Sequence, residues 1–300
     1  MNFAFSEEQE QLREFVRQFL ENYSAETTVR ELMETESGYD AATWSMMAEQ
    51  LGLQSLIIPE EYGGQGFGYV ELIVVLEEMG RALLCAPFFS TVVLAANTLI
   101  HSGDDAAKAE LLPGIASGET IATLAFTEES GRWDEAGITM EATADGDGWT
   151  LSGTKMYVLD GHIASLVLVA ARTANGVSLF RVDGDAAGLT RTALATMDMT
   201  RKQARLEFDG VAATMIGAEG GTDLRVGETA MLADGAMRAF LSRVTEDAAR
   251  LSVGGEMIDL AVGRSGTVGD CEVTLNGTDG AVARLSATCG GSGGDAEDRA

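Results

Sequence analysis

The sequence predicts an α+β protein: an N-terminal helical domain, then a small β-barrel domain, then a short atypical C-terminal region. Three observations carry this prediction. Apolar residues recur at helical spacing over residues 1–119, and the apolar period falls toward two over residues 120–218. Over residues 219–300 small residues dominate, and Phe240 is the only aromatic residue. We therefore expect three domains with these boundaries.

The N-terminal domain begins with a capping box, in which Ser6 and Gln9 can each accept a hydrogen bond from the other's backbone N–H group. Asp40 can cap a second helix, which Gly52 ends. Apolar spacing of three to four residues predicts five helices in all. They lie near Ser6–Leu20, Asp40–Gly52, Val70–Arg81, Ser90–Leu99 and Asp104–Ile115.

In the second domain, short runs rich in Val, Thr, Tyr and Ile alternate with turns that contain Gly and Asp. The segment Asp145–Gly148 reads as a hairpin turn, because Asp and Gly tolerate positive φ. Seven short strands at close spacing favour a barrel or a sandwich. They are expected at Ile121–Phe126, Ile138–Ala142, Trp149–Leu151, Lys155–Val158, Leu166–Ala170, Val177–Val182 and Arg205–Phe208.

The C-terminal region is predicted to be partly helical and partly disordered. Met231, Met237, Leu241, Val244, Ala248 and Leu251 recur at intervals of about three to four residues, so residues 223–260 are expected to hold one or two helices. Two strands are expected beyond them, at Cys271–Leu275 and Ala281–Ala287. The polar end GGSGGDAEDRA is expected to be disordered.

Charge and composition exclude several classes of function. The formal net charge is −27, and such an acidic chain repels nucleic-acid phosphates and anionic membranes. The three cysteines show no metal-ligand spacing, so we expect neither a disulfide framework nor a zinc site. No signal peptide or apolar run long enough to span a membrane is visible, and a cytoplasmic location is expected.

Four motifs in order carry a family resemblance. They are IPEEYGGQGFGYVELIVVLEEMGRAL, LAFTEESGRWD, LSGTKMYVLDGHIASLVLVAART and MDMTRKQARLEFDGV. The first resembles the N-terminal domain of the acyl-CoA dehydrogenase family, and the other three resemble strands of that family's middle domain. The resemblance implies a flavoprotein that uses FAD.

The resemblance also implies cofactor-binding positions. Phe126 and Thr127 would contact the pyrimidine side of the flavin ring, and Tyr157 would pack against the ring. Trp133 and Leu159 stand at two further cofactor positions, where the family has hydroxyl side chains. Read alone, Phe126 and Tyr157 could equally be core residues of strands, and Thr127 a turn residue.

The function implied by the resemblance is α,β-dehydrogenation of an acyl-CoA thioester, with electrons passed on to an electron-transferring flavoprotein. The family's C-terminal four-helix bundle supplies the catalytic base, and we find no matching motif here, so no catalytic residue is assigned. Two interpretations of the C-terminal region stay open: a diverged or truncated family domain, or a segment foreign to the family, such as the product of a reading-frame shift. The alternative function is a non-catalytic subunit that pairs with a catalytic homologue.

Overall fold

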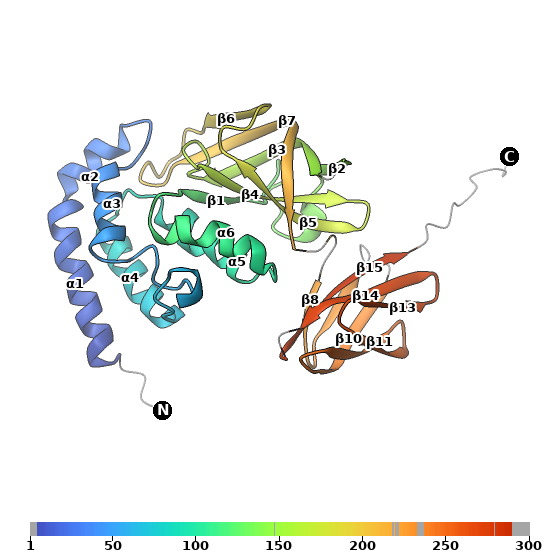
Figure 1. Ribbon diagram of the computed structural model, residues 1–300. Coiled ribbons are helices and arrows are strands. Elements are labelled where there is room, and N and C mark those ends of the chain that lie inside the picture. The colour runs from blue at the N-terminus through green and yellow to red at the C-terminus, as the bar shows by residue number, and fades with distance from the viewer. Residues whose placement is uncertain are drawn as a thin grey trace. The chain divides into compact units, whose positions relative to one another are not determined.

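The computed structural model describes residues 5–146, 148–217, 219, 222–232, 237–278 and 280–289. They form two compact units. In the first, the described residues up to Ala171 group with Leu179–Ile216; in the second, Arg172–Ser178 group with the described residues from Gly217 onward. The predicted boundary at residue 119 thus divides two parts of one compact unit, and the α+β fold class is confirmed (Figure 1).

The helical part follows the predicted pattern closely. Ser6 and Gln9 form the expected capping box, and Asp40 accepts a hydrogen bond from the Thr43 backbone as an N-cap. The second helix was not predicted; it has no side-chain cap, and Val29 is its only buried residue. The helices are α1 (Glu7–Tyr23), α2 (Glu26–Met33), α3 (Ala41–Glu49), η1 (Glu60–Tyr62), α4 (Tyr69–Arg81), the π-helix η2 (Phe89–Ala96), α5 (Asn97–Ile100) and α6 (Asp105–Ala116).

A buried carboxylate joins α1 to α4. The Glu78 side chain is 2% exposed and accepts hydrogen bonds from Arg17 at 2.7 and 3.0 Å. Arg81 donates to it at 2.7 Å, and Arg13 lies 3.4 Å away. Chiefly because of the hydrogen bonds from Arg17, the pKa of Glu78 falls to about 2. The ionised carboxylate therefore stabilises this helix pair.

Replacing Glu78 with glutamine is expected to lower the free energy of unfolding by about 1–2 kcal/mol at pH 7, because Arg17 and Arg81 are partly exposed and solvent screens the pairs. A carboxyl with a depressed folded-state pKa stabilises the fold above its ordinary value of 4.5, and this contribution is lost as the pH falls toward 2. Urea unfolding followed by tryptophan fluorescence between pH 7 and pH 2.5 tests both points. Glu77→Gln, at a carboxylate that is 60% exposed, is the control and should have little effect.

The β part of the first unit is a small barrel. Its strands are β1 (Ala122–Ala125), β2 (Glu141–Asp145), β3 (Gly148–Leu159), β4 (Leu166–Thr173), β5 (Gly176–Asp183), β6 (Leu189–Ala193) and β7 (Gln203–Ile216). Pairings run β4–β2–β3–β7–β5 and return from β5 to β4, which closes the ring. β1 adds to β4 in parallel, and β6 adds to β7. The predicted hairpin between β2 and β3 is confirmed, since Asp145 pairs with Gly148.

Two predicted strands are one in the structure. The segments expected at Trp149–Leu151 and Lys155–Val158 are both part of β3, whose pairing with β7 shifts register between Leu151 and Gly153. Gly153 has φ 146°, and a side chain there would meet Met140. A bulge at glycine therefore bends β3 without ending it.

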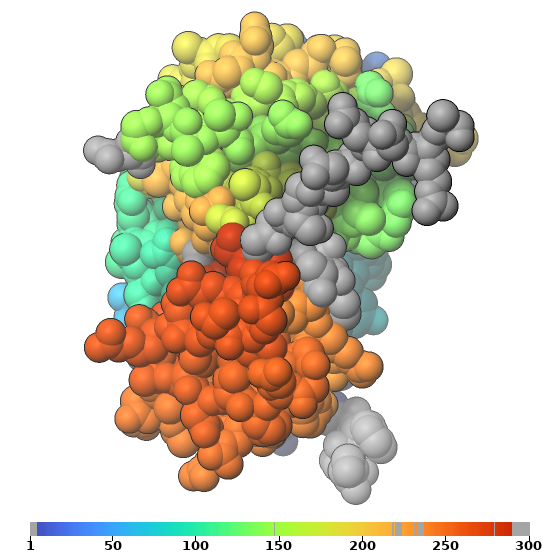
Figure 2. Space-filling view, turned by 90° about the vertical axis from the view of Figure 1, so that its right-hand side faces the viewer, coloured from blue at the N-terminus to red at the C-terminus, as the bar shows by residue number. Residues whose placement is uncertain are grey.

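The helices predicted over residues 223–260 are wrong, because the described residues there form strands. The second unit holds two four-stranded antiparallel sheets, ordered β12–β11–β10–β9 and β13–β14–β15–β8 (orange to red in Figures 1 and 2). Its strands are β8 (Thr222–Arg225), β9 (Thr229–Leu232), β10 (Met237–Val244), β11 (Ala248–Val253), β12 (Glu256–Ala261), β13 (Arg264–Val268), β14 (Cys271–Thr278) and β15 (Val282–Cys289). The last two confirm the strands predicted there.

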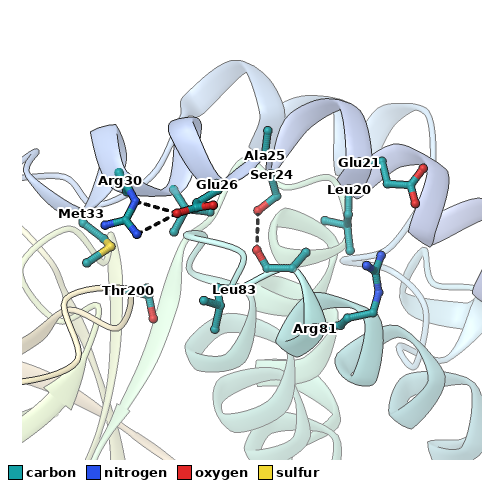
Figure 3. A pocket seen from close by; sticks show the side chains of 12 residues that line it. Leu20, Glu21, Ser24, Ala25, Glu26, Arg30, Met33, Arg81, Leu83 and Thr200 are labelled. Carbon is teal, nitrogen blue, oxygen red and sulfur yellow. Dashed lines mark hydrogen bonds and ion pairs between the residues drawn. The ribbon is translucent and has the colours of Figure 1, made fainter.

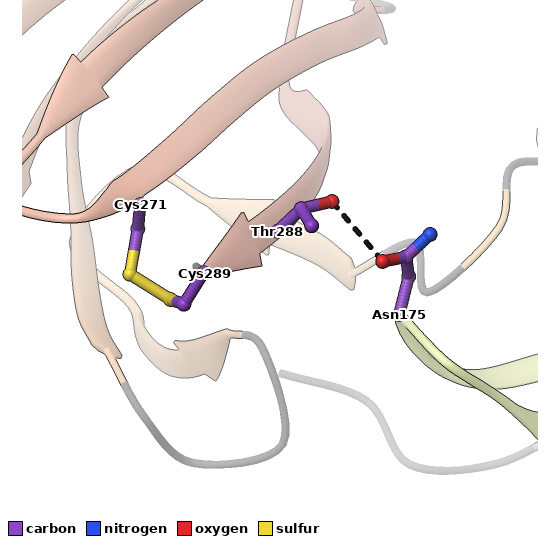
Figure 4. Close-up of a disulfide and its surroundings, with 4 residues drawn as sticks. All are labelled: Asn175, Cys271, Thr288 and Cys289. Carbon is purple, nitrogen blue, oxygen red and sulfur yellow. Dashed lines mark hydrogen bonds between the residues drawn. A yellow bond between two sulfur atoms is a disulfide. The ribbon is translucent and has the colours of Figure 1, made fainter. Parts of the chain in front are cut away.

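The second unit has a core of its own, which includes Leu241, Leu251, Val273 and Leu285. Cys271 and Cys289 are cross-strand neighbours joined by a disulfide (Figure 4), a single bond that the sequence analysis did not predict. Cys85 is free and buried. The end GGSGGDAEDRA, predicted to be disordered, lies outside the described residues. No helix in the described part of the chain is long and apolar enough to cross a membrane.

Candidate functional site

The end of β1 and the bend of β3 lie side by side in the barrel. The Met156 backbone N–H donates to the Thr127 carbonyl at 2.8 Å. Phe126 contacts Trp133 edge to face, with ring centroids 6.0 Å apart. Trp133 is 81% exposed, so its ring lies at the molecular surface. Arg132 forms an ion pair with Asp134 at 2.6 Å, so its guanidinium group already has a partner.

Tyr157 occupies a strained position on β3. Its φ is 58°, in the left-handed region that non-glycine residues rarely adopt. The register between β3 and β7 shifts between Lys155 and Val158, so Tyr157 lies on a bulge, and it is 51% exposed. A bulky residue held at positive φ costs about 1–3 kcal/mol and is typical of functional sites. The positive φ on a bulge therefore keeps Tyr157 as a candidate site residue.

A buried ion pair fixes the two segments beneath these side chains. Lys155 is fully buried, and its Nζ lies 2.7 Å from Glu128 Oε1. Glu128 also accepts hydrogen bonds from the Thr139 and Met140 backbone N–H groups at 3.0 Å. Burial acts to raise the pKa of Glu128, but the hydrogen bonds from Lys155 and Thr139 lower it below its ordinary value. Burial lowers the pKa of Lys155, against the pull of Glu128.

Leu159 lies two residues beyond Tyr157 and lines a cavity of about 590 Å³ with Phe89, Met197 and Arg201. A second cavity, of about 250 Å³, adjoins it and shares Phe89, Asp198 and Arg201. The remaining walls of the second cavity are mostly apolar: Leu76, Met79, Gly80, Leu83, Leu84, Ala86, Phe88 and Thr200. The pair of cavities thus leads from Leu159 to an apolar space beside α4.

A third cavity, of about 630 Å³, lies at the junction of α1, α2 and the end of α4 (Figure 3). It shares Leu83 and Thr200 with the apolar cavity. Within it the Ser24 hydroxyl donates to the Ala82 carbonyl, and Arg30 is ion-paired with Glu26. None of the sequence-predicted site residues lines this cavity.

Asp160, next to Leu159, is a buried acid. It is 6% exposed, has φ 52°, and accepts a hydrogen bond from the Ser90 hydroxyl at 2.6 Å. Burial raises the pKa of Asp160, although Ser90 and the charges of Arg201 and His162 partly oppose this. The bond to Ser90 ties the π-helix η2, which carries Phe89, to the end of β3.

Replacing Asp160 with asparagine is expected to raise the melting temperature at pH 7 by about 2–4 °C, or about 1 kcal/mol. A carboxyl with a raised folded-state pKa contributes stability that is complete below its ordinary value of 3.8 and is lost as the pH rises through the folded-state pKa. Asparagine removes this loss, keeps an acceptor for Ser90 and tolerates positive φ. Thermal unfolding at pH 7 and pH 4 tests this: a gain at pH 7 that shrinks at pH 4 is expected, and an equal loss at both would contradict it. Asp160→Ala, which removes the acceptor, should be destabilising.

The structure brings four of the five predicted cofactor positions into one surface region. Phe126 contacts Trp133, and the backbone bond from Met156 to Thr127 brings Thr127 beside the residue that precedes Tyr157. Leu159 lines the neighbouring cavity instead. The Lys155–Glu128 pair and the cavity residues other than Leu159 were not predicted. Lys155 and Glu128 do stand inside the quoted motifs, so part of the signal was present.

Comparison with known proteins identifies the family. The model of the acyl-CoA dehydrogenase N-terminal domain matches residues 6–119, and that of the middle domain matches residues 123–211. The acyl-CoA dehydrogenase FadE27 of Mycobacterium tuberculosis is 31% identical over 226 residues, which cover 75% of this chain and 59% of that protein. The acyl-CoA dehydrogenase IpdE2 of Mycolicibacterium smegmatis is 33% identical over 227 residues, 76% of this chain and 58% of that protein.

Solved structures agree with this. The ChsE4–ChsE5 complex from Mycobacterium tuberculosis has 30% identity and a TM-score of 0.66, covering 73% of this chain and 59% of that one. An acyl-CoA dehydrogenase from Geobacillus kaustophilus has 26% identity and the same TM-score, covering 73% and 60%. The chain thus spans about three-fifths of the length of these relatives. Over its helical and barrel domains, the chain belongs to the acyl-CoA dehydrogenase family.

Proposed function

We propose that the first unit is the flavin-binding and acyl-binding part of an acyl-CoA dehydrogenase, which carries out α,β-dehydrogenation of an acyl-CoA thioester with FAD as the hydride acceptor. The observation that carries the proposal is Tyr157: an aromatic side chain, half-exposed and held at φ 58°, beside Thr127. A core residue of a strand would be buried and unstrained, so the alternative interpretation of Tyr157 as core is disfavoured.

The residues present fit a flavin. An isoalloxazine ring needs aromatic or apolar faces and hydrogen-bonding groups at its polar edge. Phe126, Trp133 and Tyr157 supply the aromatic surface. Thr127 is 7% exposed, and among the described residues its hydroxyl has no hydrogen-bond partner. A hydroxyl with a free donor suits the polar edge of such a ring. When bound, FAD would supply the hydride-accepting chemistry.

The two adjoining cavities fit the acyl-CoA substrate. Leu76, Met79, Leu84 and Phe88 make the inner cavity apolar, which suits a hydrocarbon chain. Leu159 and Phe89 line the outer cavity, between the apolar space and the Tyr157 segment. An acyl chain in the inner cavity would point its thioester toward that segment. We assign no catalytic base: Asp198 lines both cavities, but it accepts hydrogen bonds from the Thr200 backbone and hydroxyl.

A second candidate function is a non-catalytic subunit that pairs with a catalytic homologue. Trp133 and Leu159 favour it, because they place apolar side chains at positions where the resemblance calls for hydroxyls. The similar ChsE4–ChsE5 structure is a complex of two proteins, which is consistent with paired subunits in this family. An electron-transferring flavoprotein is the proposed electron acceptor for the first candidate and is not needed by the second.

Visible absorption of the purified chain, before and after FAD is added and excess FAD removed, tests the proposal. Protein-bound flavin bands that bleach anaerobically with an acyl-CoA support the dehydrogenase. Bound flavin that no acyl-CoA bleaches supports the non-catalytic subunit, which a pull-down from native cells should recover with a dehydrogenase homologue. A colourless protein that ignores FAD would overturn the flavin site.

A further inference from the structure

The C-terminal unit contains the same sequence pattern twice. The segment Asp223-Leu-Arg-Val-Gly227 matches Asp259-Leu-Ala-Val-Gly263, 36 residues later. Farther along, Leu241 matches Leu275, and Ala249-Arg-Leu-Ser252 matches Ala283-Arg-Leu-Ser286, both 34 residues later. The offset changes because the connection after β9 is two residues longer than the one after β13. Repeat 1 (residues 223–253) and repeat 2 (residues 259–287) therefore align across their length.

The backbone repeats with the sequence. The N–H group of Gly227 donates to the Leu241 carbonyl at 2.8 Å, and that of Gly263 donates to the Leu275 carbonyl at 2.7 Å. The β10–β11 hairpin shifts register directly after Leu241, and the β14–β15 hairpin shifts directly after Leu275. Matching bulges at matching residues are features of one fold used twice, since bulges are specific local structures.

The two repeats exchange their first strands. β8 belongs to repeat 1 but pairs with β15 of repeat 2, so that Leu224 faces Ala283. β12 opens repeat 2 but pairs with β11 of repeat 1, so that Leu260 faces the matching Ala249. Each sheet therefore contains strands of both repeats, and the two share one core. The first strand of each repeat thus has its pairing partner in the other repeat.

The sheets differ in how their last long strand is held. After β11 the chain turns at Gly254 and Gly255, with φ of 57° and 94°, and returns as β12. At the matching positions of repeat 2, Thr288 and Cys289 continue β15. The fourth strand there, β8, pairs with β15 only from Val282 to Leu285. Among the described residues, Thr288 and Cys289 therefore pair only with β14, and the disulfide to Cys271 joins the two strands there (Figure 4).

We propose that the Cys271–Cys289 disulfide holds the end of β15 at the positions where repeat 1 has its Gly254–Gly255 turn, and that it makes repeat 2's sheet the redox-sensitive half of the unit. A dithiol reductant would donate two electrons and two protons, becoming a disulfide itself as Cys271 and Cys289 become thiols. The end of β15 would then keep only its pairing with β14. At that end the Thr288 hydroxyl bonds Asn175 Oδ1 of the β4–β5 turn at 3.2 Å, and this contact would loosen with it.

The first sheet has no cysteine and is an internal control. Its residues matching Cys271 and Cys289 are Met237 and Gly255. A reductant should therefore speed amide exchange in β14, β15 and β8 and leave β10 and β11 little changed. Loss of a disulfide of this loop length typically lowers stability enough to reduce the melting temperature of a small domain by about 10 °C or more.

Hydrogen exchange of the full chain, measured by mass spectrometry with and without dithiothreitol, tests the proposal. Thiol titration of the unfolded, unreduced chain should find one free thiol, Cys85, and three after reduction. Cys289→Ser should reproduce the exchange of the reduced chain and show no further response to reductant. Cys85→Ala, in the first unit, should respond as the unaltered chain does. Three thiols before reduction, or equal changes in both sheets, would overturn the proposal; if Cys289→Ser does not fold, exchange of the reduced natural chain still decides.

Discussion

Replacing Lys155 with methionine is expected to lower the free energy of unfolding of the first unit by about 3–5 kcal/mol, because breaking a buried ion pair leaves an uncompensated charge. Lys155 is fully buried, and Glu128 is held by three groups from residues 139 and 140 as well as by Lys155. Glu128 cannot turn to solvent without giving up those bonds. Methionine fills the space of the lysine stem but offers no hydrogen-bond donor. The loss of stability therefore comes mainly from the lost charge pairing.

Urea unfolding followed by tryptophan fluorescence measures this effect, since Trp44, Trp133 and Trp149 all belong to the first unit. Arg132→Met is the matched control: its ion pair with Asp134 is more than half exposed on both sides, so little loss of stability is expected. Adding Glu128→Gln to Lys155→Met should recover part of the loss by removing the buried charge. A single variant as stable as the control would show that the pair does not hold β1 and β3 together.

The sequence predicts the first unit well because its signals are local. The capping box at Ser6, the apolar spacing of α4 and the turn at Asp145–Gly148 each depend on residues within a few positions, and each is confirmed. The Lys155–Glu128 pair could not be predicted in this way. Its residues are 27 positions apart, and only the closing of the barrel brings a lysine of β3 to the end of β1.

The strands of the C-terminal unit resemble helices in sequence for a physical reason. Met237, Leu241, Val244 and Leu251 lie three to seven residues apart, as they would on one face of a helix. The structure buries Met237, Ala239 and Leu241, and again Ala249, Leu251 and Val253, which is the period of a strand. Alanine carries little hydrophobic signal, so the alternating pattern was concealed. The repeated Asp-Leu-x-Val-Gly pattern was visible in the sequence and would have indicated a duplicated module.

Replacing Tyr157 with glycine is expected to weaken FAD binding at least tenfold without lowering the melting temperature. The loss of affinity corresponds to about 1.4 kcal/mol, within what an aromatic contact and its buried area supply. Glycine adopts φ 58° without strain, and the relief of about 1–3 kcal/mol offsets the cost of about 0.5–1 kcal/mol for a more flexible chain. Function and stability should therefore change in opposite directions at this residue.

Flavin fluorescence quenching and thermal unfolding, measured on the same samples, separate the two effects. Leu83→Gly is the matched control, because Leu83 is also exposed and has φ 50°, but the two cavities that it lines include none of the predicted cofactor positions. It should gain or keep stability and leave FAD affinity within about twofold, while Tyr157→Trp should retain binding because an aromatic face remains. If Tyr157→Gly unfolds at a lower temperature and still binds FAD as tightly as the natural chain, the strain at Tyr157 serves the barrel and not the flavin. Because the strained backbone costs stability that glycine would recover, a ligand in contact with the exposed ring is the reason that we propose for a tyrosine at this bulge.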